Sequence, residues 1–170
     1  MRKPLAICFV ILLAGVGNAL ATAEITVSPD TLLFPDYWFA PLETGTFTFP
    51  DPMFVKNIGT ETVELGFSAS CNYWHIDTVG IYGDTARIWG IITDELFFGA
   101  FNLPENAILT EPRFSGDGHF GDAGISLSPG DSVFFYISFR APLRITSWPH
   151  SADTFSVFVH ARGAISSDVG

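Results

Sequence analysis

Apolar and polar residues alternate along much of the chain with a spacing of two. Between Thr62 and Ala69 every second residue is apolar, so Val63, Leu65 and Phe67 fall on one side of an extended backbone. This period is typical of a strand with one buried face. Runs of the same kind predict further strands at Ile25–Val27, Thr31–Phe34, Met53–Asn57, Ile76–Tyr82, Ala86–Thr93, Glu95–Phe101, Asp131–Arg140 and Asp153–Arg162.

Groups of turn-forming residues separate these runs, and helical spacing is almost absent. Many short strands between regular turns are typical of a β-sandwich, so the sequence predicts an all-β, immunoglobulin-like fold of about 7–9 antiparallel strands. An inserted hairpin is expected in the middle of the chain, with Ala86–Thr93 paired against Glu95–Phe101. The alternation also predicts that Phe135, Val157 and Leu65 are buried together between the sheets.

The first 23 residues have the organisation of a secretory signal peptide. Arg2 and Lys3 precede an apolar stretch from Leu5 to Val16, and the small residues Ala21 and Ala23 suit a signal-peptidase site. We expect cleavage after Ala23, a sandwich domain at residues 24–163 and a short tail at 164–170. The apolar stretch is too short to span a membrane. The processed chain is therefore expected in the periplasm, on the cell surface or outside the cell, and the short signal without any Asn-x-Ser/Thr motif favours a bacterial source.

Acidic residues dominate the charge. The chain has 18 Asp and Glu against 8 Lys and Arg, a formal net charge of −10, and cleavage would remove two of the basic residues. This balance disfavours binding to nucleic acid or to anionic membrane surfaces. Only Cys71 would remain after cleavage, so no internal disulfide is expected and the core must depend on packing.

Four segments occur in the order of a known domain family. They are Ile25–Phe34, Phe54–Gly59 leading into Val63–Leu65, Leu127–Ser132 before an alternating strand, and the closing Phe155–Gly163. Together they resemble the abnormal-spindle/hydin type of immunoglobulin-like domain found in bacterial exported proteins, a relative of the major sperm protein fold. The match is good at both ends of the processed chain and poor from His75 to Gly124.

The resemblance implies a scaffold, adhesion or protein-interaction role and no catalytic residue. One departure is Phe139-Arg140-Ala141-Pro142, which has one residue more than the Phe-x-Pro ending of the family pattern. Domains of this family often occur in tandem within long surface proteins. A single free-standing copy and a fragment of such an array both remain open.

The Gly130-Asp131-Ser132 triplet matches the nucleophile motif of one group of serine esterases. In that group the serine comes early and is followed by a helix whose amino end helps to stabilise the oxyanion. Ser132 lies late in the chain and precedes an alternating run. We therefore expect it to begin a strand and to have no catalytic role, with Pro129 helping to set the turn.

Asp117, His119 and Asp122 form an acidic, glycine-rich stretch in which a metal site is conceivable. The stretch lacks the ligand spacing of the strong calcium and zinc motifs, so a solvated loop is the favoured interpretation and no cofactor is expected. A pair of acidic residues for glycoside hydrolysis stays open, because their separation is set by the fold.

Aromatic residues in or beside expected loops are candidates for binding. Tyr37, Trp38 and Trp148 are the binding residues we expect, whereas for Trp74 a core position is favoured. The main hypothesis is a non-catalytic structural or interaction module with a protein or glycan partner at the cell surface. The alternatives are a carbohydrate-binding module and, more remotely, a small hydrolase.

Overall fold

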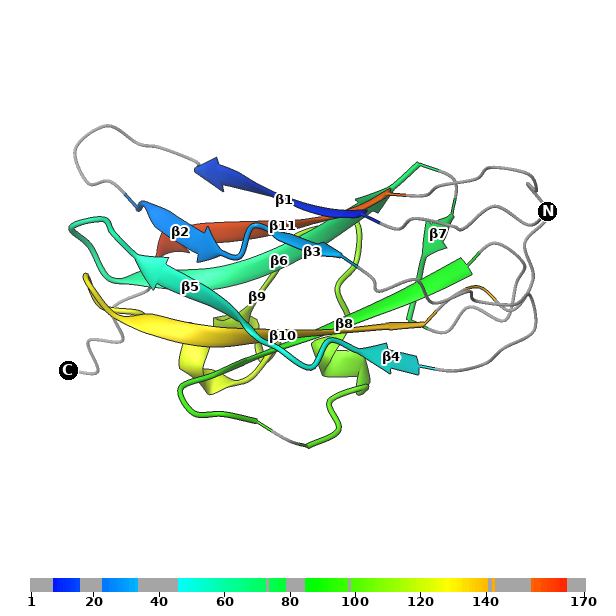
Figure 1. The fold of residues 1–170 in the computed structure, drawn as a ribbon. Coiled ribbons are helices and arrows are strands. Elements are labelled where there is room, and N and C mark those ends of the chain that lie inside the picture. The colour runs from blue at the N-terminus through cyan, green and yellow to red at the C-terminus, as the bar shows by residue number, and fades with distance from the viewer. Residues whose placement is uncertain are drawn as a thin grey trace.

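The computed structural model describes residues 8–15, 23–33, 46–72, 74–78, 85–97, 99–140, 142 and 154–164. These residues form two β-sheets that pack face to face (Figure 1). The other regular elements described are three single-turn 3-10 helices, η1 (Pro104–Asn106), η2 (Ser115–Asp117) and η3 (Asp122–Gly124). The predicted all-β sandwich is confirmed.

The first sheet, called the β10 sheet, has the strand order β2–β5–β10–β8–β7, and β4 also pairs with β10. Strand β10 lies at its centre and is antiparallel to β8, β5 and β4. The strands of this sheet are β2 (Ile25–Ser28), β4 (Thr46–Thr48), β5 (Met53–Asn57), β7 (His75–Ile76), β8 (Thr85–Thr93) and β10 (Ser132–Arg140).

The second sheet, called the β11 sheet, has the order β3–β1–β11–β6–β9. Strand β11 is antiparallel to β6 on one side and parallel to β1 on the other. The strands are β1 (Cys8–Gly15), β3 (Thr31–Leu33), β6 (Val63–Cys71), β9 (Arg113–Phe114) and β11 (Thr154–Gly163). The described residues thus contain eleven strands, more than expected, partly because β4 and β9 are too short to show a period in the sequence.

The core lies between the two sheets. Phe135 of β10, Leu65 of β6 and Val157 of β11 are fully buried in one cluster, which confirms the predicted register of all three strands. The rings of Phe67 and Phe135 stack across the two sheets, with centroids 4.0 Å apart and planes 14° apart. On β8, a Cβ added to Gly90 would lie 2.6 Å from the Phe135 ring, so this ring packs directly against backbone.

A second apolar cluster covers the outer face of the β10 sheet. We call it the outer cluster. Its buried members are Trp89, Phe101, Ala107 and Tyr136, and its half-buried members are Ile91, Phe97, Leu109 and Phe134. The chain after β8 crosses this face, which lies at the bottom of Figure 1. It is held there in part by a hydrogen bond from the Phe97 amide to the Tyr136 hydroxyl, 3.1 Å long.

The expected hairpin in the middle of the chain was wrong. Ala86–Thr93 does form a strand, β8, but Glu95–Phe101 is not a strand at any of its described residues. The outer edge of β8 is instead taken by the later segment around Ala107, which bridges to Trp89. Phe97 and Phe101 cover the sheet face and do not extend the sheet. The Phe97 ring packs on Tyr136 and the Phe101 ring packs on Phe97, which removes more apolar surface from water than an edge position would.

Strand β1 lies within the segment predicted to be the signal peptide. Its eight residues pair with Thr154–Ala161 of β11, and its first three pair with β3. In the uncleaved chain, residues 8–15 therefore lie in the β11 sheet, between β3 and β11. Cleavage after Ala23 stays a prediction. In the described part of the chain, no helix has the length and apolar character needed to cross a membrane.

Candidate functional site

Ser132 is the first residue of β10, as predicted, and its side chain is exposed. It pairs in register with Lys56 of β5. The turn before it is closed by a hydrogen bond from the Asp131 amide to the Ser128 carbonyl, 3.1 Å long, with Gly130 at φ 88°. This left-handed backbone explains the glycine, since other residues rarely adopt it.

Buried Asn57 joins this turn to the turn after β5. Its side-chain amide donates to the carbonyls of Glu61 and Leu127, at 2.7 and 2.8 Å, and its oxygen accepts from the Gly59 amide at 2.9 Å. The backbone of Asn57 also accepts from the Gly130 amide. One asparagine thus fixes both turns at this end of the sandwich, which gives a physical reason for the Asn-x-Gly pattern seen in the sequence.

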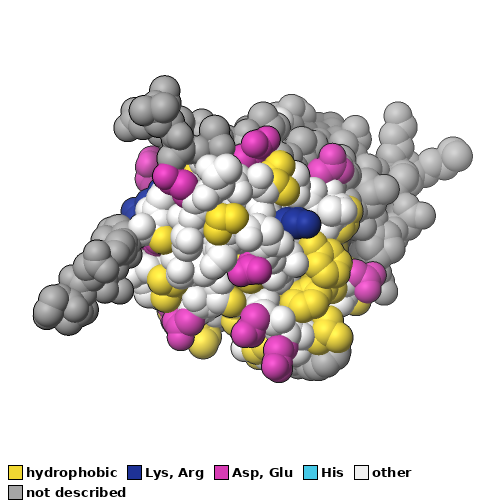
Figure 2. Space-filling view, turned by 90° about the vertical axis from the view of Figure 1, so that its left-hand side faces the viewer, with side chains coloured by type: hydrophobic (Ala, Val, Ile, Leu, Met, Phe, Trp, Pro, Cys, Tyr) yellow, Lys and Arg dark blue, Asp and Glu magenta, His cyan; other side chains and the backbone are white. Residues whose placement is uncertain are grey.

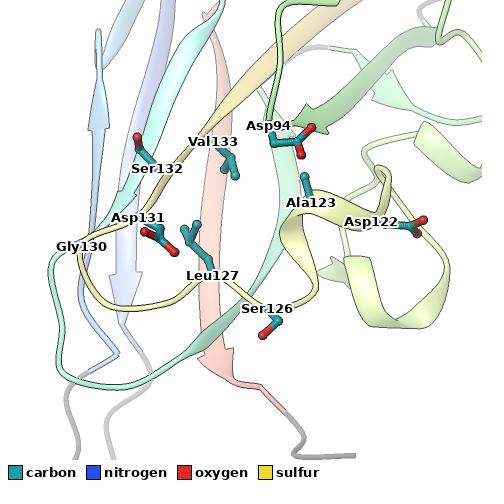
Figure 3. Close-up of a pocket in the computed structure, with 9 residues that line it drawn as sticks. All are labelled: Asp94, Asp122, Ala123, Ser126, Leu127, Gly130, Asp131, Ser132 and Val133. Atoms are coloured by element: carbon teal, nitrogen blue, oxygen red, sulfur yellow. The ribbon is translucent and has the colours of Figure 1, made fainter.

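An open pocket of about 530 Å³ lies beside these turns. Its lining is mainly polar and includes Asp94, Asp122, Asp131 and Ser132. Figure 3 shows the three carboxyl groups spread around the pocket and not converging on one point. Figure 2 looks at this end of the sandwich and shows acidic side chains dispersed over it, with hydrophobic side chains gathered at one side.

The acidic stretch predicted as a weak metal candidate has its side chains directed to different places. Asp117 contacts Arg162, with 3.3 Å between carboxylate oxygen and guanidinium nitrogen. His119 shares a 2.8 Å hydrogen bond with Arg113, and Asp122 lines the pocket. Among the described residues, no three carboxylate, imidazole or thiol side chains are grouped to hold a metal ion.

A serine–histidine pair occurs on the outer face of the β11 sheet, far in sequence from the Gly-Asp-Ser triplet. Ser68 Oγ and His160 Nε2 are 2.8 Å apart. A nucleophilic serine also needs free donors for a developing oxyanion. The neighbouring Ala69 amide already donates to the Leu109 carbonyl at 2.7 Å, and β6 is paired on both sides. The pair is therefore built as a packing contact between two strands.

Two histidines make stability depend on pH. Burial lowers the pKa of His160, and burial together with the Arg113 charge lowers the pKa of His119. Since each folded-state pKa lies below the ordinary value of about 6.5, the unfolded chain binds protons more readily. The contribution of these two histidines to the free energy of unfolding should be fully present above about pH 6.5 and should decrease as the pH falls below that value.

We expect the free energy of unfolding, measured in urea, to decrease between about pH 7 and pH 5, above the range where most carboxylates titrate. His160→Gln keeps a hydrogen-bonding group near Ser68 but cannot take up a proton, so its decrease should be smaller. Equal pH slopes for the wild type and this variant would contradict the role assigned to His160.

The predicted binding aromatics Tyr37, Trp38 and Trp148 lie outside the described residues. Trp74 is described and buried, which confirms the interpretation favoured for it. Its ring packs on Phe139 and Phe155, with centroids 6.2 and 5.2 Å away.

An exposed aromatic pair lies on the outer face of the β10 sheet. Phe54 of β5 and Phe134 of β10 are directly opposite in register, and their ring centroids are 5.1 Å apart. Phe54 is 47% exposed, and Phe134 also packs against the outer cluster. We call this pair the Phe54–Phe134 patch. The patch is the part of this apolar face where a large side chain, Phe54, stays exposed beside the outer cluster.

The sequence interpretation missed this patch because it looked for binding aromatics only in or beside expected loops. A signal was present, since Phe54 lies between inward-facing Met53 and Val55, and Phe134 lies between inward-facing Val133 and Phe135. Each ring therefore had to point outward. That the two meet depends on the pairing of β5 with β10, which connects residues about eighty positions apart.

Comparison with known proteins identifies no relative of this chain. No family model matches the chain, and no curated protein or solved structure is significantly similar to it.

Proposed function

We propose that the chain is an exported, non-catalytic interaction module of the immunoglobulin type that binds a protein partner through the Phe54–Phe134 patch. The single observation that supports this most is the half-exposed Phe54, whose ring lies 5.1 Å from that of Phe134 on a paired strand. Aromatic side chains are enriched at the centres of protein interfaces, where they bury large areas at low entropic cost. A structural role in a tandem array of such domains is consistent with the same surface.

Export is proposed from the basic start, apolar stretch and small residues that end at Ala23. The abnormal-spindle/hydin assignment is proposed from the four ordered segments and agrees with the sandwich architecture. The binding partner would then lie in the periplasm, on the cell surface or outside the cell. Because the chain carries a net charge of −10, a partner with basic residues around an apolar centre fits the patch and its surroundings best.

A carbohydrate partner fits the described aromatics less well. Sugar rings stack on flat aromatic surfaces, whereas the planes of Phe54 and Phe134 are inclined by 53°. Tilted rings that leave a wedge suit an apolar side chain of a protein better than the face of a pyranose. We therefore place the protein partner first.

Photo-crosslinking in the producing cell tests this function. With benzoylphenylalanine at position 54 or 134, we expect a discrete adduct of higher mass with one protein partner. The matched control is Ile58, which is 45% exposed but lies in the turn after β5, away from the patch. Adducts of equal yield from position 58 would count against the patch.

The competing hydrolase hypothesis is tested on the same purified protein. Ester hydrolysis that disappears in Ser132→Ala would refute a non-catalytic role, and we expect no such activity.

A further inference from the structure

The place of β1 in the β11 sheet is unusual for a segment predicted to be removed. Strand β1 lies between β3 and β11, and all eight of its residues, Cys8–Gly15, pair in parallel with Thr154–Ala161. Figure 1 shows it running alongside β11 at the top of the sandwich. An extended segment thus covers eight of the ten residues along one edge of β11.

Signal-peptide cleavage would take β1 away from between β3 and β11, so β11 would lose one neighbour and β3 would lose the strand with which it pairs. The expected cut after Ala23 falls between β1, which ends at Gly15, and β2, which begins at Ile25. Every other strand follows the cut. This step rests on the proposed export of the chain.

The edge exposed by this loss belongs to the core of the domain. Strand β11 is ten residues long, and its side chains Phe155, Val157 and Val159 are fully buried between the sheets. An unpaired edge of this length presents a row of free amide and carbonyl groups, which is a ready template for another strand. A long, regular strand that is fixed by β6 on its other side is a well-ordered template.

Neighbouring segments of the chain are poorly placed to fill the gap. Strand β3 pairs with β1 at three residues only, so it would cover less than half of the eight-residue edge. After β11, the Ala164 amide donates to the Thr62 carbonyl at 3.1 Å, which turns the chain toward the start of β6 and away from the β1 side. Among the described segments, none is placed to cover the whole of this edge, so a strand of another polypeptide could occupy it.

We infer that the β1 position of the processed protein is a strand-acceptor site, which takes an apolar, extended segment of another polypeptide in parallel register with β11. The structure supplies the template for the occupant in the segment Cys8–Gly15, whose residues are apolar throughout and include no proline. Strand addition of this kind draws affinity from main-chain hydrogen bonds, and the side chains that enter the sheet give selectivity. Leader removal thus converts a closed edge into a binding site.

The experiment uses the full chain exported by a bacterial host through its own leader. The intact mass of the purified protein reports whether the leader has been removed. The probe is a synthetic peptide with the sequence of residues 8–15, with serine in place of Cys8 and lysines at both ends for solubility. The control peptide has the same lysines and carries proline at the positions of Val10 and Leu12, where it removes amide donors.

We expect the processed protein to bind the probe at one site per chain, and to bind the proline peptide at least about tenfold more weakly, because a strand with two prolines cannot complete the ladder. Hydrogen exchange of β11 amides should slow when the probe binds. A photo-reactive residue at the position of Leu12 should crosslink near Phe158, its partner in the observed register.

The outcomes separate this inference from the export on which it rests. A processed protein that does not bind the probe, or that binds both peptides equally, would overturn the acceptor site while export stands. A stable dimer that the probe fails to dissociate or enter would also overturn it, because the β11 edge would then not accept the apolar segment that the site is inferred to take. A measured mass that includes the leader would overturn the acceptor site, because β1 would then keep its place beside β11. The Phe54–Phe134 patch would still be tested by its own crosslinking experiment.

Discussion

Phe135→Ala should destabilise the domain by about 3–5 kcal/mol, the range for removing a large aromatic ring from a core. The ring is fully buried, stacks on Phe67 at 4.0 Å, and lies against the backbone of Gly90. Because its neighbours belong to paired strands of both sheets, they cannot easily collapse into the space left behind. Urea unfolding followed by circular dichroism should show a lower midpoint with an unchanged slope.

The matched control is Phe54→Ala, which makes the same truncation on the outer face. Phe54 is half-exposed and contacts mainly one ring, so its loss should cost only about 1 kcal/mol or less. If Phe135→Ala yields no folded protein, Phe135→Leu should still fold and lose about 1–2 kcal/mol, since part of the volume is kept. Equal effects at positions 135 and 54 would contradict the assignment of Phe135 to the core and of Phe54 to the outer face of the β10 sheet.

The strands that the sequence predicted best are those in which apolar residues alternate. Strand β5 has the predicted bounds Met53–Asn57, and the inward residues of β6, β10 and β11 are the ones that alternation selects. In β5 and β11 the period of two follows from burial on one side, whereas β6 and β10 are buried on both faces over most of their length and the alternation marks the side that faces the core. Such patterns need no knowledge of which strand is the neighbour.

The hairpin prediction failed where two structures share one pattern. Glu95–Phe101 alternates like a strand, yet Phe97 and Phe101 belong to the outer cluster and lie in an irregular segment. The apolar stretch containing Cys8–Gly15 also suits both a signal peptide and a strand, and the signal peptide stays a prediction. Short apolar runs do not distinguish these possibilities, because the periodicity is the same in each.

The candidate sites were less predictable than the fold. The Phe54–Phe134 patch depends on strand pairing, and the pocket is lined by Asp94 and Asp131 from separate loops. Neither proximity is visible in a linear pattern of residue types. The sequence interpretation therefore chose aromatics in expected loops and one local acidic stretch, which can be identified without knowing which strands are neighbours.

The remaining large effect concerns a buried carboxylate in the β11 sheet. Glu64 of β6 is only 3% exposed and pairs in register with Arg162 of β11. It accepts hydrogen bonds from the guanidinium at 2.6 and 3.0 Å and from the Gly116 amide at 2.7 Å. Arg162 also lies over the Phe114 ring at 4.0 Å, and its hydrogen bonds to Glu64 raise its own pKa.

Arg162→Met should cost about 2–3 kcal/mol at neutral pH, because it keeps the apolar stem on Phe114 but leaves the Glu64 carboxylate with one amide donor. This is below the 3–5 kcal/mol typical of a fully buried pair, since Arg162 is 38% exposed and water can reach the vacated place. The double variant Glu64→Leu with Arg162→Met also removes the unpaired Glu64 carboxylate and should recover most of the lost free energy of unfolding. Arg140→Met, on β10, makes the same truncation where the structure shows no ion pair with a described residue, and should change stability by about 0.5 kcal/mol or less. If the double variant were less stable than Arg162→Met alone, the Glu64 carboxylate would be stabilising by itself, and the cost of Arg162→Met would have to come from lost packing on Phe114.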